Sequence, residues 1–279
     1  MPPPVVTGLN ALVASGLFLG LTVVSAAAQP ASSSATPSST ATSSTAASTT
    51  PPASALPSVG ATARVHGIEW DLHEITIGQV KRMAVATNFV SRAEKEGGGY
   101  IYENGWAKKS NWNWRQPFGI PGADAEPAVH LTFDEAQSIC RFFGKRLPTD
   151  REWTQAAYLE DRLVTPKGFQ RGQRYEYPNG ASPKGSHCLA GCGIYRGAAP
   201  SGSLDRGVGH VPVFTTPPGV NGLYDMGGNV WEWVDTGLGD ERITRGSSWW
   251  YRADRQREND VASKPRDTRV AYIGFRCVR

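Results

Sequence analysis

Residues 221–235 read NGLYDMGGNVWEWVD, and this stretch carries the strongest fold signal in the chain. Its three glycines allow backbone angles that other residues avoid, and two tryptophans flank Glu232. Such a stretch predicts a tight, buried loop whose carbonyls and carboxylates face inward. A buried carboxylate needs a cation, an arginine or several N–H groups as its partner. Asp225 and Glu232 therefore indicate either a calcium site with hard oxygen ligands or a salt bridge, and these residues alone leave both open.

The segment GLYDMGGNVWEWV at 222–234 resembles the signature of the sulfatase-modifying-factor family, that of the formylglycine-generating enzyme. Three further stretches agree with this family in order and spacing: VHLTFDEAQSICRFFGKRLPTDREWTQAAY at 129–158, RGSSW at 245–249 and GFRC at 274–277. The resemblance implies an α+β fold, the sulfatase-modifying-factor fold. This fold is a decorated relative of the C-type lectin fold, with short antiparallel strands, two to three main helices and much irregular loop. Activity is a separate question, because one fold hosts many functions.

The N-terminal residues differ in composition from the rest of the chain. Residues 12–24 (LVASGLFLGLTVV) form an apolar run of signal-peptide length rather than membrane-spanning length. Residues 30–58 are almost all Ser, Thr, Ala and Pro, and this composition cannot bury a core. We therefore expect a signal peptide at 1–28, a disordered linker at 29–63, a folded domain at 64–279, and a periplasmic or secreted protein.

The charge pattern bears on the class of partner. The net charge is +4, and no run of Lys or Arg is longer than two residues. These features do not favour nucleic acid as a partner. We expect a protein, peptide or small-molecule ligand, and no membrane span after removal of the signal peptide.

The four cysteines predict two disulfides, because an even count in an exported chain is typical of a disulfide framework. The family resemblance pairs Cys140 with Cys277. Cys188 and Cys192 (CLAGC) remain, and they are close enough in sequence to close a small loop. A metal site at this second pair is the alternative, with His187 adjacent, but no further Cys or His cluster completes four ligands.

Local patterns predict three helices. Capping boxes at Thr76, Thr132 and Thr149, each with Glu or Gln three residues later, mark their first turns. Apolar residues spaced i, i+3, i+4, i+7 after Thr132 make the second helix the clearest, with Gly144 as its C-cap. We expect strands at 64–72, 242–245 and 271–277, and a loop-rich excursion at 91–120. The tryptophans of this excursion form either satellite core or a ligand-stacking surface.

This chain lacks the two cysteines that the resemblance would require for the family's copper chemistry. Formylglycine-generating enzymes bind copper through two cysteines, and soft thiolates suit Cu(I). Aligning the family motif to residues 245–249 places Tyr251 and Gln256 at those two positions, and no cysteine lies between Cys192 and Cys277. Copper is therefore not expected, and the chain-distant pair Cys188 and Cys192 is a less favoured substitute. Iron is not supported either, because the five histidines show no HxxxH pattern.

Two sets of site residues follow from the resemblance, while the catalytic residues remain unknown. A candidate cleft would be lined by Ser248, Trp249, Tyr251 and Arg252. Tyr251 and Arg252 suit an anionic or aromatic ligand, although they can equally be strand residues that fill vacated space. A structural calcium ion would be held by Asp225, the carbonyls of Gly228 and Val230, and Glu232.

The favoured hypothesis is an exported binding or accessory protein of this family without formylglycine-generating activity, because both thiols are replaced. The alternative is a periplasmic oxidoreductase of the formylglycine-generating and pyoverdine-maturation superfamily with an altered active site. The retained cleft frame motivates this alternative.

Overall fold

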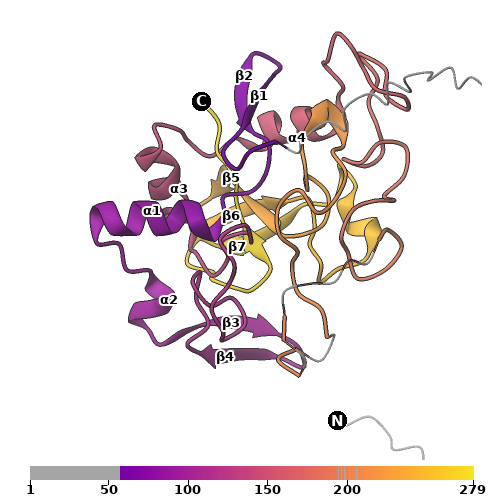
Figure 1. Cartoon of the computed structure of the whole chain (residues 1–279). Coiled ribbons are helices and arrows are strands. Elements are labelled where there is room, and N and C mark those ends of the chain that lie inside the picture. Colours follow the sequence, from indigo (N-terminus) through magenta and orange to yellow (C-terminus); the bar gives the residue numbers. More distant parts are fainter. Residues whose placement is uncertain (1–56, 194, 196, 198, 201, 205–206) are drawn as a thin grey trace, which may run out of the picture. The chain divides into compact units, whose positions relative to one another are not determined.

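The computed structural model describes residues 57–279, except 194, 196, 198, 201, 205 and 206 (Figure 1). The expected signal peptide at 1–28 and most of the expected linker at 29–63 lie outside the described residues. Strand β1 (Thr62–Val65) begins two residues before the expected start of the domain at residue 64. Within the described part of the chain, no helix has the length and apolar character needed to cross a membrane.

The expected single strand at 64–72 is wrong, because this segment forms a hairpin. β1 pairs antiparallel with β2 (Ile68–Asp71), and Val65 lies opposite Ile68. The two turn residues, His66 and Gly67, have φ values of 48° and 82°. A two-residue turn with positive φ at both positions matches the right-handed twist of paired strands, so the His-Gly dipeptide reverses the chain.

The three expected helices are confirmed as α1 (Ile77–Thr87), α3 (Phe133–Phe142) and α4 (Asp150–Tyr158). Each begins with the predicted capping box, in which the threonine hydroxyl and the Glu or Gln side chain satisfy each other's backbone N–H groups. α1 and α3 lie side by side (Figure 1). Gly144, just beyond α3, has a φ of 68°, the left-handed conformation expected of a glycine that ends a helix.

Residues 91–120 contain more regular structure than the sequence indicated. A short helix α2 (Arg92–Lys95) leads into a hairpin of β3 (Gly98–Tyr102) and β4 (Trp106–Ser110). Three glycines at 97–99 suggested a loop, but Gly98 lies so close to the β4 backbone that an added Cβ would stand 2.0 Å from the carbonyl oxygen of Lys109. The glycines therefore permit close strand pairing instead of breaking it.

The main sheet among the described residues has the order β7-β6-β5-β8. Its strands are β5 (Trp231–Leu238), β6 (Glu241–Arg245), β7 (Ala262–Pro265) and β8 (Ile273–Gly274). β5 is antiparallel to β6 and parallel to β8. Of two short 3-10 helices, η1 (Val220–Gly222) precedes β5, and η2 (Ala253–Gln256) lies between β6 and β7. The expected loop at 221–235 is thus only partly correct, because its last five residues begin the central strand β5.

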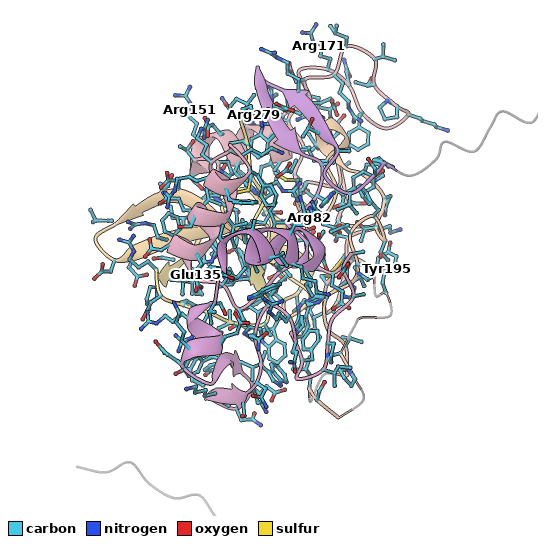
Figure 2. All side chains as sticks on the ribbon, turned by 60° about the vertical axis from the view of Figure 1, so that its left-hand side comes forward. Arg82, Glu135, Arg151, Arg171, Tyr195 and Arg279 are labelled. Carbon is cyan, nitrogen blue, oxygen red and sulfur yellow. A yellow bond between two sulfur atoms is a disulfide. The ribbon has the colours of Figure 1, made fainter. Side chains whose placement is uncertain are left out.

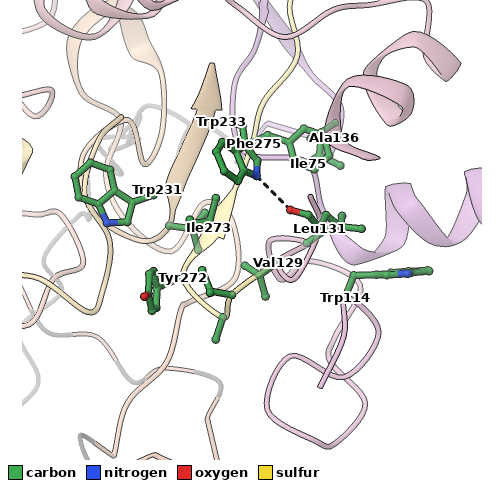
Figure 3. Packing of buried hydrophobic residues seen from close by; sticks show 14 of the residues in the cluster. Ile75, Trp114, Val129, Leu131, Ala136, Trp231, Trp233, Tyr272, Ile273 and Phe275 are labelled. Carbon is green, nitrogen blue, oxygen red and sulfur yellow. Dashed lines mark hydrogen bonds between the residues drawn. The ribbon is translucent and has the colours of Figure 1, made fainter. Parts of the chain in front are cut away.

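The core lies between this sheet and the helices. Trp233 of β5 donates its indole N–H to the carbonyl oxygen of Leu131 at 3.2 Å, just before α3 (Figure 3). Three aromatic residues of the 91–120 segment, Trp112, Trp114 and Phe118, belong to this main buried cluster, so they are core residues, although not of a separate satellite core. Trp106 instead keeps 58% of its surface exposed.

The two disulfides link residues in the predicted pairs. Cys140 of α3 bonds to Cys277 near the C-terminus, and both residues are fully buried. Cys188 bonds to Cys192 and closes a short loop. Charged side chains such as Arg151 and Arg171 project outward from the ribbon (Figure 2).

Candidate functional site

Glu232 is neutralised by a buried arginine. Arg276 is fully buried and donates from Nε and Nη2 to both carboxylate oxygens of Glu232, at 2.6 to 3.0 Å. Trp153 of α4 adds its indole N–H to Glu232 Oε2 at 2.8 Å. Arg276 also donates to the carbonyl oxygens of Asp71, Leu72 and Tyr224. The salt-bridge alternative for Glu232 is therefore present, and it joins β5 to the C-terminal segment.

Asp225 has a different environment. Its Oδ1 accepts a hydrogen bond from the Thr216 hydroxyl at 2.6 Å, whereas its buried Oδ2 has no hydrogen-bond partner in the structure. Glu74, which precedes α1, is fully buried and also keeps one oxygen, Oε2, without a partner. Its other oxygen accepts from Asn229 Nδ2 at 3.0 Å. Sequence reasoning missed Glu74, because no local pattern connects it with residues 221–235.

The charged forms of Asp225 and Glu74 are disfavoured in this environment. Burial raises the pKa of Asp225 to about 6, and the Thr216 hydrogen bond only partly opposes this effect. Burial also raises the pKa of Glu74 well above its ordinary value, and the neighbouring Asp225 carboxylate adds to the shift. Burying two charged carboxylates with unpartnered oxygens is energetically costly. Binding of a proton or of a cation removes this cost.

The donor set fits calcium in part. Asp225 Oδ2 and Glu74 Oε2 are hard oxygen donors with free capacity, which is what calcium prefers. Glu232 would have to share its carboxylate with Arg276 and Trp153. No group of three or more His, Cys, Asp or Glu side chains is positioned to hold a metal ion within the described residues. A calcium ion here would therefore depend on backbone carbonyls for several of its ligands.

Gly228 and Val230, the two predicted carbonyl ligands, are held in the same buried segment. An added Cβ on Gly228 would stand 2.4 Å from the carbonyl oxygen of His187, and the Gly228 N–H donates to Gly246 at 2.8 Å. Val230 is fully buried in the main core. Only glycine permits this close approach of the 228 backbone to residue 187.

The four candidate cleft residues separate into two pairs. Tyr251 and Arg252 line a pocket of about 240 Å³, together with Leu189, Trp250, Asp254 and Arg255. Ser248 and Trp249 are fully buried, and the Trp249 ring packs edge-on against Phe118 and Trp250. These two residues do not line the pocket but contact Trp250, which does. The resemblance could not show this, because burial depends on segments distant in sequence.

Aromatic and cationic groups shape this pocket. The Tyr251 ring packs edge-on against Trp231 and Tyr272, with ring centres 5.6 and 5.9 Å apart. The Arg255 guanidinium lies 5.7 Å from the centre of the Tyr251 ring and pairs with Asp260 at 3.0 Å. The Arg252 side chain is 71% exposed. Two arginines beside an aromatic wall suit a ligand that is anionic, aromatic or both.

Gln256, the second position at which the resemblance implies a thiol, contacts the CLAGC loop. Its Nε2 donates to Cys192 Sγ at 3.6 Å, and its Oε1 accepts from the Ser186 hydroxyl at 3.0 Å. The Leu189 N–H donates to Tyr251 at 2.8 Å, and the Ala253 N–H donates to Ala190 at 2.9 Å. Two cysteines far from Gln256 in sequence are thus packed against the segment 251–256.

His187, the adjacent candidate metal ligand, is otherwise engaged. Its Nε2 lies 2.8 Å from the carbonyl oxygen of Gly209, and its Nδ1 accepts from the Tyr195 N–H at 3.2 Å. Together with the Cys188–Cys192 bond, these contacts favour the disulfide over a metal site at this loop.

A second pocket, of about 390 Å³, lies away from residues 251–256. It is lined by Tyr100, Trp106, Lys264, Pro265, Asp267, Thr268, Arg269 and Val270. The exposed ring of Trp106 lines this pocket, so the ligand-stacking alternative for the 91–120 segment applies to Trp106.

Comparisons with known proteins find relatives of this chain in both sequence and fold. The sulfatase-modifying factor enzyme 1-like domain family matches residues 40–279. The chain is 25% identical to the formylglycine-generating enzyme of Mus musculus over 76% of this chain and 66% of the mouse protein. It is 33% identical to a Bos taurus protein named inactive C-alpha-formylglycine-generating enzyme 2, over 62% of this chain and 58% of the bovine protein. The chain therefore spans about three fifths of these relatives' length.

A bacterial relative and a solved structure are also similar. The formylglycine-generating enzyme of Streptomyces coelicolor is 28% identical over 77% of this chain and 79% of its own length. The structure of PvdO from Pseudomonas aeruginosa superposes with a TM-score of 0.51 and 18% identity, over 76% of this chain and 80% of that one. At this identity the structural likeness shows a shared fold.

Proposed function

Because the chain belongs to the sulfatase-modifying factor enzyme 1-like family, we propose that it is an exported ligand-binding member that does not generate formylglycine. One observation carries this proposal. At the two positions where the resemblance implies copper-binding cysteines, the chain has Tyr251, which lines a pocket, and Gln256, which is buried against Cys192. Neither side chain supplies the thiolate that Cu(I) requires.

The pocket at Tyr251 is the proposed ligand site. A volume of about 240 Å³ accommodates a small group, such as one residue of a peptide or part of a small molecule. Arg252 and Arg255 can pair with a carboxylate or phosphate, and the Tyr251 ring can stack on a planar group. The bovine relative that is named inactive provides a precedent for a family member with that description.

The first test is an activity assay on the full chain with copper, oxygen and a cysteine-containing sulfatase peptide. We expect no conversion of the peptide cysteine to formylglycine, as followed by the mass of the peptide. Stoichiometric or catalytic conversion would overturn the proposal. Binding is tested separately by titrating anionic and aromatic ligands into the wild type and into a Tyr251→Phe, Arg252→Ala variant, with Arg171→Ala as an exposed control outside the pocket.

We also propose a structural calcium ion at Asp225. The unpartnered, buried Oδ2 of Asp225 supports it, and the neighbouring Glu74 oxygen strengthens the negative potential there. Elemental analysis of the purified protein should find about one calcium per chain. A chelator should then lower the melting temperature of the wild type but not that of Asp225→Ala. Absence of calcium from protein purified with calcium present would refute this site.

The two disulfides and the apolar run at 12–24 support the export proposal. N-terminal sequencing of the protein recovered from an exporting host should begin near residue 29.

An oxidoreductase with an altered site is the second candidate. The observation that favours it is the packing of the Cys188–Cys192 disulfide against Gln256, at a position that the resemblance assigns to the active site.

A further inference from the structure

We propose that Cys188 and Cys192 are a redox-active pair that exchanges disulfides with substrate thiols beside the Tyr251 pocket. This inference gives the oxidoreductase candidate its residues and its substrate class, and it does not depend on ligand binding by the pocket. It begins from a placement that the sequence does not show. The loop 188–192 is paired with residues 251–253 and touches Gln256.

The two sulfur atoms differ in access. Cys188 keeps only 1% of its surface exposed, whereas Cys192 is partly exposed. Thiol–disulfide exchange begins when a thiolate reaches one sulfur of the bond, and the other sulfur leaves. The structure therefore assigns Cys192 as the sulfur that is attacked and Cys188 as the buried leaving group. Cys140 and Cys277 are both fully buried, so their disulfide offers no such entry.

The surroundings of the pair favour a stable dithiol form. Gln256 Nε2 can donate to a Cys192 thiolate, because it already lies 3.6 Å from Sγ. Cys188 Sγ lies 3.1 Å from the carbonyl oxygen of Ala190, which can accept a thiol proton. The Arg252 backbone pairs with Ala190, which holds the loop against the segment that lines the Tyr251 pocket.

The loop does not rely on the disulfide for its position. The Leu189 N–H donates to Tyr251, the Ala253 N–H donates to Ala190, and the Cys188 N–H donates to Gly193 at 3.2 Å. These backbone hydrogen bonds remain available when the sulfur–sulfur bond is broken. The two thiols therefore stay close enough to reform the bond, which a reversible redox pair requires.

A substrate thiolate attacks Cys192 Sγ, the bond between Cys188 and Cys192 breaks, and Cys188 leaves as a thiolate that takes up a proton. A second substrate thiol attacks the substrate sulfur of the mixed disulfide and releases Cys192. Two substrate thiols become one disulfide, while the protein disulfide gains two electrons and two protons. A low-molecular-weight disulfide, reduced to two thiols, regenerates the pair.

The test uses the folded, full-length chain in a graded series of reduced and oxidised glutathione. After equilibration, free thiols are alkylated and each cysteine is assigned by mass spectrometry. We expect Cys188 and Cys192 to become alkylated in buffers that leave Cys140–Cys277 intact, so the buried disulfide serves as an internal control. If both disulfides resist every buffer, or if they are reduced only together, the proposal is overturned.

Single-cysteine variants test the assigned order. Cys188→Ser should form a mixed disulfide with oxidised glutathione at Cys192 at least about tenfold faster than Cys192→Ser does at Cys188, because access controls the attack. Equal rates would overturn the assignment of Cys192 as the attacked sulfur. The formylglycine assay is separate. Its positive outcome would refute the proposed function and leave this exchange reaction to be judged by the glutathione series alone.

Discussion

At the scale of single residues, the buried Arg276–Glu232 pair links three distant segments. Arg276 contacts Glu232 on β5, the backbone carbonyls at the end of β2, and Tyr224. We expect Arg276→Met to lower the free energy of unfolding by about 3–5 kcal/mol, because it leaves the Glu232 charge buried without its partner. Urea denaturation of both proteins measures this change.

A double variant provides the control for this pair. Adding Glu232→Gln to Arg276→Met removes the unpaired charge, so part of the lost stability should return. If the double variant is as unstable as the sum of two single variants, charge burial is not the cause of the loss.

His73 makes stability depend on pH. The Gly60 N–H donates to His73 Nε2 at 3.0 Å, which requires that nitrogen to be unprotonated. Burial lowers the pKa of His73 from 6.5 to about 4. Between these values the unfolded chain binds a proton that the native chain does not. The free energy of unfolding should therefore fall as pH falls from 6.5 to 4, by ~3 kcal/mol at most for this residue.

The measurement is urea denaturation at several pH values for the wild type and for His73→Asn. The variant should show a shallower loss between pH 6.5 and 4. Some acid sensitivity should remain in it, because burial also lowers the pKa of His130 to about 4. Identical pH dependence in both proteins would contradict the assigned role of His73.

At the scale of elements, the capping boxes are the features that sequence predicts best. In α3, Thr132 Oγ1 accepts from the Glu135 N–H at 3.3 Å, and the Glu135 carboxylate accepts from the Thr132 N–H at 2.8 Å. Thr132→Ala should cost about 1 kcal/mol in the free energy of unfolding. Thr132→Ser keeps the hydroxyl and should retain most of the stability. Equal losses for Ala and Ser, measured by denaturation, would assign the effect to the lost methyl group.

The hairpins were harder to predict than the helices. A capping box and a helical apolar period lie within one turn of chain, so local sequence specifies them. β5 lacks the alternation of a half-buried strand, because residues 231–234 are all buried between neighbouring strands and core. The β3–β4 pair has glycines where strand formers are usual. In both β5 and the β3–β4 pair, the segment forms a strand because it pairs with a neighbouring strand.

At the scale of the whole molecule, the Cys140–Cys277 disulfide closes a loop with a sequence separation of 137 residues. Replacing both cysteines by alanine should lower the free energy of unfolding by about 5 kcal/mol in the chain-entropy account. The same change at Cys188 and Cys192, which are separated by 4 residues, should cost only about 2 kcal/mol. Denaturation of the two double variants compares them. A larger loss for the short loop would show that its disulfide does more than limit chain entropy.

The sequence by itself determined the three main helices, and its resemblance to the family implied the fold and the Cys140–Cys277 pair, which left Cys188 and Cys192 as the second pair. These follow from local patterns and from the order of motifs along the chain. The burial of Ser248 and Trp249 could not be read from the sequence, because long-range packing produces it.

Only the tertiary structure decided which groups meet. Glu74 approaches the 221–235 segment through Asn229, a contact across 155 positions, and Cys192 meets Gln256 across 64. Buried polar groups must be satisfied wherever the fold places them, and no periodic pattern records a partner that lies so far away. The place of Glu74 beside the candidate calcium ligands and the contact of the candidate redox pair with Gln256 are therefore properties of the folded chain.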